Sequence, residues 1–425
     1  MATFATPKTG TMSFRKFLPV SLMAGAVVST ASAQSVNQDD RADQVQINTI
    51  TTAVPFLMIG PDAHAGGMAE VGAATPANGS SIHWNPAKMA FLDNKMGFAV
   101  SYTPWLRALV PDINLAYISG YGKIGKKGQQ TLAGSLRYFS LGEITFTDNV
   151  GNVIGNFTPN EFALDVAYAR QLSKEFSGGI ALRYIYSNLT GGISVGGATT
   201  RPGQAGAADI SFYYRTQRVE IAKKKTEISA GIVFSNLGSK MSYTQNNEED
   251  FIPMNFRFGL GFKMWLDEHN SLGVYYDLNK LLVPTPPKLG KVVQANGDTL
   301  DGQIIAGKDP NVSVPAAIFQ SFADAPGGSA EEWKEVNHSI AIEYWYQKLF
   351  SVRAGYFHED ITKGNRQFFT VGAGIRYNVF GIDFAYLIPT QQNHPLQNTL
   401  RFTLTFDFAN LKKKDKTKDD GRPEE

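Results

Sequence analysis

The sequence predicts an all-β fold, a 14-stranded antiparallel transmembrane β-barrel with a small N-terminal hatch. Three observations predict it: segments that alternate between apolar and polar residues, segment lengths near those needed to cross a bilayer, and loop lengths that alternate along the chain. The 425 residues include no cysteine, which excludes disulfides, thiolate metal sites and a thiol nucleophile. A formal charge of +2 gives no reason to expect nucleic acid as a partner.

Residues 1–33 read as a secretory signal peptide. A basic region that ends at Lys16 precedes the short apolar stretch Phe17–Val28, and Ala31–Ala33 forms a small-residue cleavage site. The alternative, a buried N-terminal helix, fits these flanks less well. After Gln34 no run of 18 apolar residues appears, so the sequence predicts an exported chain without a helical membrane anchor.

The barrel is predicted over 95–408 from period-2 alternation. In 255–266, for example, alternate residues from Phe256 onward are apolar, as expected for a lipid-facing side, and the others are mostly polar or glycine. Leu260 is expected to tolerate arginine poorly, and Gly259 is expected to tolerate serine better. The predicted strands are 95–103, 113–124, 129–142, 161–172, 175–189, 206–221, 225–238, 251–266, 270–283, 337–347, 349–360, 366–379, 381–390 and 399–408.

Loop lengths favour a membrane barrel over a soluble β-sandwich. Short turns follow the even-numbered strands and longer loops follow the odd-numbered ones, the longest being 284–336. An even strand count predicts that both termini are periplasmic. Aromatic residues near strand ends, including Trp265, Tyr275 and Tyr377, are expected to form interfacial girdles. The charged tail 409–425 is expected to be a solvated periplasmic extension, with a peptidoglycan or partner contact as the alternative.

The segment 34–94 precedes the first strand and is too polar to span a membrane, so we expect it to plug the lumen from the periplasmic side. It contains the motif His83, Trp84, Asn85, Pro86 and Ala87, for which an architectural role is favoured. Asn85 is suited to cap a turn before proline. The six histidines lack ligand spacing, and no G-x-S-x-G elbow accompanies the motif. We therefore expect no catalytic, metal or cofactor site.

This segment resembles the N-terminal hatch of FadL-like outer-membrane proteins. Four stretches, Asn48–Met58, Ser81–Pro86, Tyr102–Asn114 and Ile318–Gly328, are more narrowly similar to the PorV family of the type IX secretion system. His64 and Ala69 replace an arginine and a glycine that the family hatch often carries, which affects only a local contact of the hatch.

The resemblance implies a binding and shuttle function without bond chemistry. Its implied partners are a large translocon barrel (SprA-like), a sortase-like attachment protein (PorU-like), cargo with a C-terminal signal domain, and outer-membrane lipid or lipopolysaccharide. The alternative is a FadL-like channel for uptake of hydrophobic molecules, and a third possibility is a lipid-modifying enzyme, which lacks a convincing catalytic set.

Two outer loops contain candidate binding residues. In the longest loop, Ile318, Phe319 and Phe322 are spaced for one apolar edge of a short helix, which would either cap the barrel mouth or bind cargo. The first loop contributes Trp105, Leu106 and Leu109.

Overall fold

The computed structural model describes residues 47–408, apart from 108, 111, 126–127, 148–149, 193–199, 245–248, 294–298 and 393. The predicted signal peptide (1–33), the first part of the predicted hatch (34–46) and the charged tail (409–425) lie outside the described residues.

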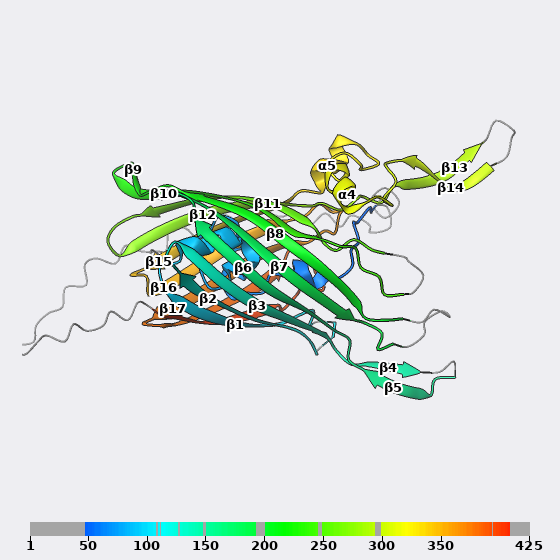
Figure 1. Ribbon diagram of the computed structural model, residues 1–425, viewed down its shortest axis with the longest axis horizontal. Helices are drawn as coiled ribbons and strands as arrows, with labels where there is room; N and C mark the ends of the chain where they lie inside the picture. The colour runs from blue at the N-terminus through cyan, green and yellow to red at the C-terminus, as the bar shows by residue number, and fades with distance from the viewer. Residues whose placement is uncertain are drawn as a thin grey trace, which may run out of the picture. The chain divides into compact units, whose positions relative to one another are not determined.

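Fourteen antiparallel strands close into a barrel, as the alternation predicted (Figure 1). Neighbours in the ring are consecutive in the chain, and the pairing of the first strand with the last closes it. The strands are β1 (Met96–Pro104), β2 (Ile113–Ile124), β3 (Gln130–Leu141), β6 (Asn160–Gln171), β7 (Phe176–Asn188), β8 (Gly203–Arg215), β10 (Lys224–Gly238), β11 (Asn255–Trp265), β12 (Asn270–Leu281), β15 (Asn337–Tyr346), β16 (Phe350–His358), β17 (Gln367–Tyr377), β18 (Phe380–Pro389) and β19 (Leu400–Phe408).

The predicted strand 206–221 is divided in the structure. Strand β8 ends at Arg215, and Val219–Ile221 form a separate strand, β9, that pairs with the start of β10. The chain reverses between β9 and β10 at Ala222 and Lys223, both with positive φ (51° and 62°), the backbone required by a two-residue hairpin turn.

The longer loops contain structure of their own. The loop after β3 forms the hairpin β4 (Ile144–Thr147) and β5 (Val153–Phe157). The longest loop contains the hairpin β13 (Lys288–Val293) and β14 (Thr299–Ala306), followed by helices α4 (Val314–Gln320) and α5 (Ser329–Lys334). We call the end of the barrel with these loops the long-loop end and the opposite end the short-turn end.

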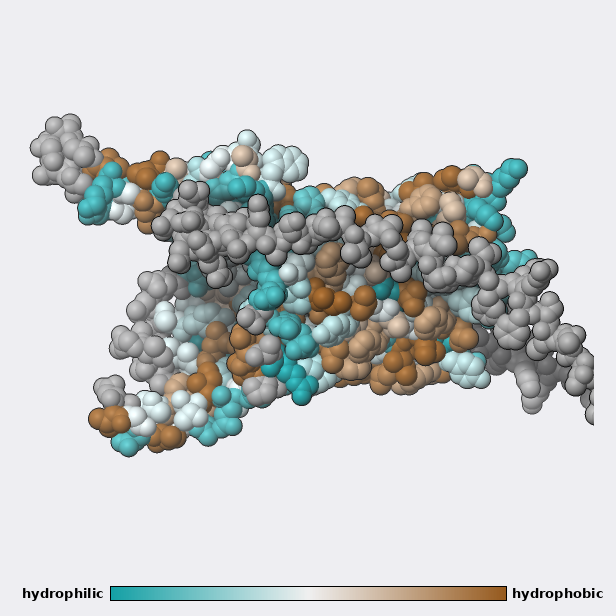
Figure 2. Space-filling model, turned by 180° about the vertical axis from the view of Figure 1, so that it is seen from behind, coloured by the Kyte–Doolittle hydropathy of each residue, from teal (hydrophilic) through white to brown (hydrophobic). Residues whose placement is uncertain are grey.

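Side chains alternate between the outside and the lumen of the barrel. On β11, Leu260 and Phe262 are exposed on the outer wall, whereas Gly259 and Gly261 are buried inside. Figure 2 shows hydrophobic residues gathered over the exposed wall, as expected for a surface in lipid. The girdle prediction fails for Tyr275, because the side chains of the odd-numbered residues 271–277 of β12 point inward and Tyr275 is therefore buried in the lumen.

Residues 47–94, the luminal segment, lie inside the barrel. The segment contains η2 (Pro55–Met58), α2 (Ala63–Gly66), α3 (Ser81–Trp84) and η3 (Pro86–Phe91). None of the helices among the described residues is long and apolar enough to cross a membrane.

The luminal segment runs from the long-loop end to the short-turn end. The Asn48 amide donates to the carbonyl of Thr362 in a long-loop-end connection, and the Lys95 amide donates to the carbonyl of Phe408 at the other end. The sequence predicted that the segment rises from the short-turn end, so the path of its described part is opposite to that prediction. The terminal residues lie outside the described part, and their periplasmic location stays a prediction.

Candidate functional site

The motif at the centre of the luminal segment joins it to the barrel wall. Asn85 caps η3 by accepting a hydrogen bond from the Ala87 amide (3.0 Å), and its side-chain amide donates to the carbonyl of Ala73 (2.9 Å). Pro86 occupies the first turn of η3, where a missing amide proton costs nothing. The hydroxyl of Ser177 on β7 donates to the carbonyl of Ala87 (2.7 Å). These bonds hold η3 against the wall.

His83 and Trp84 occupy the middle of the lumen. The Trp84 indole donates to Asp62 (2.5 Å), and its ring lies under the guanidinium of Arg257 (4.8 Å). Arg137 of β3 donates to the carbonyl of Leu57 (2.8 Å) and contacts Nδ1 of His83. An arginine that contacts both a histidine nitrogen and a backbone carbonyl fits an architectural junction, because it occupies Nδ1 of the imidazole.

Small residues of the wall allow the luminal segment to approach closely. A Cβ at Gly179 would lie 2.5 Å from the amide nitrogen of Ala87, closer than any van der Waals contact. A Cβ at Gly259 would overlap the Asp277 carboxylate and lie 2.7 Å from the Ala73 Cβ. The expectation that Gly259 tolerates serine is therefore wrong, because a polar strand face inside this barrel is packed and not open to water.

Two cavities lie at opposite ends of the luminal segment. A cavity of about 450 Å³ at the long-loop end is lined mainly by apolar side chains, including Ile50, Phe56 and Phe139. A cavity of about 540 Å³ at the short-turn end has a polar lining that includes His64 and Glu343, which form an ion pair at 3.0 Å when the histidine is protonated. Between them the lumen is packed except for a small cavity of about 20 Å³ beside His83 and Trp84.

The first outer loop divides its predicted residues between two environments. Trp105 and Leu106 line the cavity at the long-loop end, and the Trp105 amide donates to the carbonyl of Ile113 (3.0 Å). Leu106 has a positive φ of 49°, which turns the chain over the mouth. Leu109 is 62% exposed. Only Leu109 among the three is available to a partner without rearrangement.

Buried charges anchor the longest loop to the barrel rim. Glu335 follows α5 and accepts hydrogen bonds from Lys280 of β12 (2.6 Å), Lys363 (2.9 Å) and the hydroxyl of Thr285 (2.7 Å). Lys363 also donates to Glu331 (2.6 Å). The two ammonium groups and the Glu335 carboxylate are almost completely buried. Sequence reasoning missed this network, because partners such as Lys280 and Glu335 are far apart in the chain.

Two carboxyl groups of the loop have shifted pKa values. Burial raises the pKa of Asp324 to about 6, against the hydrogen bond that the Thr285 amide donates to it. Partial burial also acts to raise the pKa of Glu331, but hydrogen bonds from Lys363 and Asn48 outweigh it and hold the pKa below its ordinary value. The loop therefore contains one carboxyl held ionised and one that titrates near neutrality.

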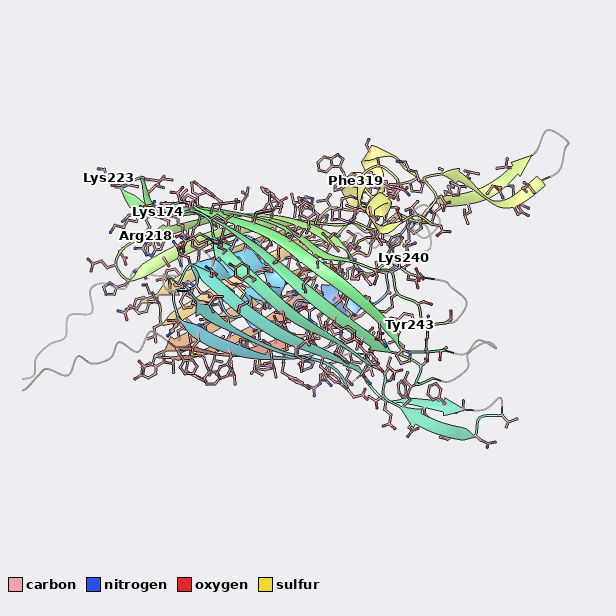
Figure 3. The ribbon with its side chains drawn as sticks, viewed as in Figure 1. Lys174, Arg218, Lys223, Lys240, Tyr243 and Phe319 are labelled. Atoms are coloured by element: carbon pink, nitrogen blue, oxygen red, sulfur yellow. The ribbon has the colours of Figure 1, made fainter. Side chains whose placement is uncertain are left out.

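Helix α4 has two unlike sides. Ala317 is fully buried and Ile318 packs beside it against the apolar residues of the mouth, whereas Phe319 is 80% exposed (Figure 3). Phe322 is half-exposed, with the Lys280 ammonium 5.9 Å from its ring centre. The predicted trio therefore does not share one edge.

Trp333 on α5 is 73% exposed, and sequence reasoning missed it. Its only signal was its place in the acidic stretch 331–335, which reads as a solvated helix. Phe319, Phe322 and Trp333 form what we call the α4–α5 platform. Exposed aromatic rings of this size on an anchored loop are typical of protein-binding surfaces.

Within the described ranges, no group of three or more histidine, aspartate or glutamate residues could hold a metal ion.

A model of the family described as "Type IX secretion system protein PorV" matches residues 41–288. No curated protein sequence matches the chain.

Three solved structures illustrate what the chain is similar to. The chain is similar to the toluene transporter TbuX of Ralstonia pickettii (11% identity, 82% of this chain and 98% of that chain, TM-score 0.43). It is similar to the toluene transporter TodX of Pseudomonas putida (9% identity, 85% and 98%, TM-score 0.44). It is also similar to a FadL homologue of Pseudomonas aeruginosa (11% identity, 85% and 100%, TM-score 0.40).

Proposed function

Since the chain belongs to the PorV family and is therefore an outer-membrane component of the type IX secretion system, we propose that it binds secreted proteins and passes them on. The sequence resemblance to this family is confirmed by the match over 41–288. In the proposed role, the chain accepts cargo with a C-terminal signal domain from a translocon barrel (SprA-like). It then delivers the cargo to an attachment complex that includes a sortase-like protein (PorU-like).

The observation that supports this role is the exposure of the α4–α5 platform. Phe319 and Trp333 lie outside the strands that face lipid, so hydrocarbon does not cover them. The opposite side of α4 covers the barrel mouth, which accounts for Ala317 and Ile318. Capping therefore explains the buried side of the helix, and partner binding explains the exposed side.

The test is the double substitution Phe319→Asp with Phe322→Asp. We expect normal barrel assembly, judged by heat-modifiable gel mobility, together with cargo stalled at the translocon or lost to the medium. The matched control is Ile144→Asp with Val153→Asp, two exposed apolar residues of the β4–β5 hairpin at the same end. Normal surface attachment of cargo in the platform variant would leave α4 only its capping role.

The luminal segment has a proposed role of its own, to keep the lumen closed. Deleting 62–90 should raise single-channel conductance in planar bilayers, because that stretch contains the residues packed between the two cavities. An unchanged conductance would remove the closing role.

Affinity purification from native membranes discriminates the shuttle from uptake. A co-purifying giant barrel with cargo supports the shuttle, whereas bound fatty acid alone supports a channel.

A further inference from the structure

The short-turn end of the barrel has basic side chains without carboxylate partners. Lysines occupy three of its turns, namely Lys174, Lys223 and Lys348, and all three are exposed. Figure 3 shows Lys174, Lys223 and Arg218 at this end, opposite Lys240 and Tyr243.

Ion pairing separates these cations from the other basic residues of the protein. Arginines of the lumen such as Arg183 and Arg353 each pair with two carboxylates. Among the residues that the structure describes, by contrast, no salt bridge involves the following short-turn cations: Lys174, Arg215, Arg218, Lys223, Lys224, Lys225, Lys263 and Lys348. The same rim also carries the carboxylates of Glu175, Glu220 and Glu268, but the eight unpaired cations exceed these three in number. The excess of cations produces a positive field that attracts anions.

The β9–β10 hairpin places part of this charge next to the lipid-facing wall. Residues paired directly across two strands point to the same face of the sheet, and so do residues two positions apart in one strand. Val219 pairs with Thr226, which is two positions from the lipid-facing Ile228 on β10. Val219 and Ile221 therefore continue the apolar outer surface, and both are exposed (40% and 38%). Lys224 pairs with Ile221 and shares that side. The Lys224 ammonium, which donates to the carbonyl of Leu266 (2.5 Å), thus lies at the border of the hydrocarbon-facing band, whereas Lys225 pairs with Glu220 on the opposite side.

The hairpin turn keeps its lysine in a strained conformation. Ala222 and Lys223 both have positive φ, where asparagine or glycine would be free of the steric cost of a Cβ. The turn between β15 and β16 repeats this with Gln347 and Lys348 (φ 51° and 56°), next to the exposed Leu349. Strain of this kind persists where the surrounding structure or a function maintains it.

We propose that the short-turn rim, centred on Lys223 and Lys224 with Lys174 and Arg218 beside them, binds phosphate headgroups of anionic phospholipids in the adjacent leaflet. Charge complementarity and continuity with the lipid-facing wall both select this occupant. An acidic protein would approach along the barrel axis, whereas these lysines adjoin side chains that face hydrocarbon. Juxtamembrane lysines attract anionic lipid in the same way in other membrane proteins. The inference goes beyond the secretion role and does not depend on it.

The test uses the full chain reconstituted in phosphatidylcholine bilayers with spin-labelled phosphatidylglycerol or spin-labelled phosphatidylcholine as the probe. Electron paramagnetic resonance measures the relative association of the two lipids with the barrel. We expect roughly a threefold preference for phosphatidylglycerol in the natural protein, decreasing as salt is raised. The variant K174Q/K223Q/K224Q should lose most of this preference.

The control variant K288Q/K308Q/K334Q removes three exposed lysines from the longest loop and should keep the preference. Heat-modifiable mobility verifies that both variants form barrels. An unchanged preference in the rim variant overturns the proposal. Equal association of both lipids with the natural protein also overturns it and would leave the rim to an acidic protein. Neither outcome bears on cargo delivery, which is measured separately.

Discussion

Replacing Glu335 by alanine should weaken the attachment of α5 to the barrel rim without unfolding the barrel. The Glu335 side chain is 2% exposed, and Lys280 and Lys363 are 6% and 4% exposed. Removing one partner of a buried ion pair costs about 3–5 kcal/mol. The lower end applies here, because Lys280 retains Glu332 (3.0 Å) and Lys363 retains Glu331 (2.6 Å). We therefore expect a local cost of about 3 kcal/mol.

Amide hydrogen exchange of peptides that cover α5 measures this cost directly. A loss of about 3 kcal/mol corresponds to exchange about a hundredfold faster, if local opening limits exchange. Peptides from β16 and β17 should exchange as before. The control is Asp301→Ala, which removes an exposed ion pair with Lys291 (3.3 Å). The Asp301 side chain is 69% exposed and the Lys291 side chain is 71% exposed. Exposed pairs contribute little. If Glu335→Ala accelerated exchange of α5 by less than about threefold, the network would not be what anchors the loop.

Three further results are expected. Leu260→Arg should destabilise the barrel by about 2–4 kcal/mol, measured by urea unfolding in liposomes, since Leu260 faces lipid. Gly259→Ser should also impair assembly, whereas Gly206→Ser should not, because nothing lies within 4 Å of a Cβ at Gly206; equal assembly of the two serine variants would contradict the packed lumen. The folded loop raises the pKa of Asp324 to about 6, so the Asp324 carboxyl binds a proton more tightly in the folded loop than in the open loop. Exchange protection, corrected for intrinsic rates, should therefore decrease as pH rises from the ordinary carboxyl pKa to about 6, and level off above it. Asp324→Asn should remove this dependence.

The barrel could be predicted because the pattern that identifies each strand lies within a short stretch of the sequence. Alternation in 255–266 identifies two strand faces, and the pairing of Leu260 with Ala230 and Tyr276 follows once neighbouring strands are antiparallel. The order of short and long loops then fixes which end each turn occupies. Strand ends were less accurate where proline or a turn intervened, as at Pro253, which cannot donate to a ladder and leaves β11 to begin at Asn255.

The lumen and the outer loop could not be predicted in the same way. The hydroxyl of Ser229 donates to the carbonyl of Ala74 across 155 positions, and no periodicity records such a contact. The sequence predicted an inward face of β11 and a plug in the lumen, but not which residues of the luminal segment, such as Ala73, lie against Gly259. The same reason hid the anchoring of α5 and the exposure of Trp333.

The path of the luminal segment bears on the choice between shuttle and channel. A hydrophobic molecule that enters at the long-loop end would reach the apolar cavity near Phe56 and then meet the packed stretch around Trp84. To pass further, it would have to break the hydrogen bond of the buried Arg137 to the carbonyl of Leu57 and its contact with His83, and leaving a buried donor unsatisfied is costly. The proposed handling of cargo on the α4–α5 platform needs no such passage, because the side chains that would bind cargo are already exposed. The packed lumen is therefore consistent with the proposal that this protein acts at the long-loop end.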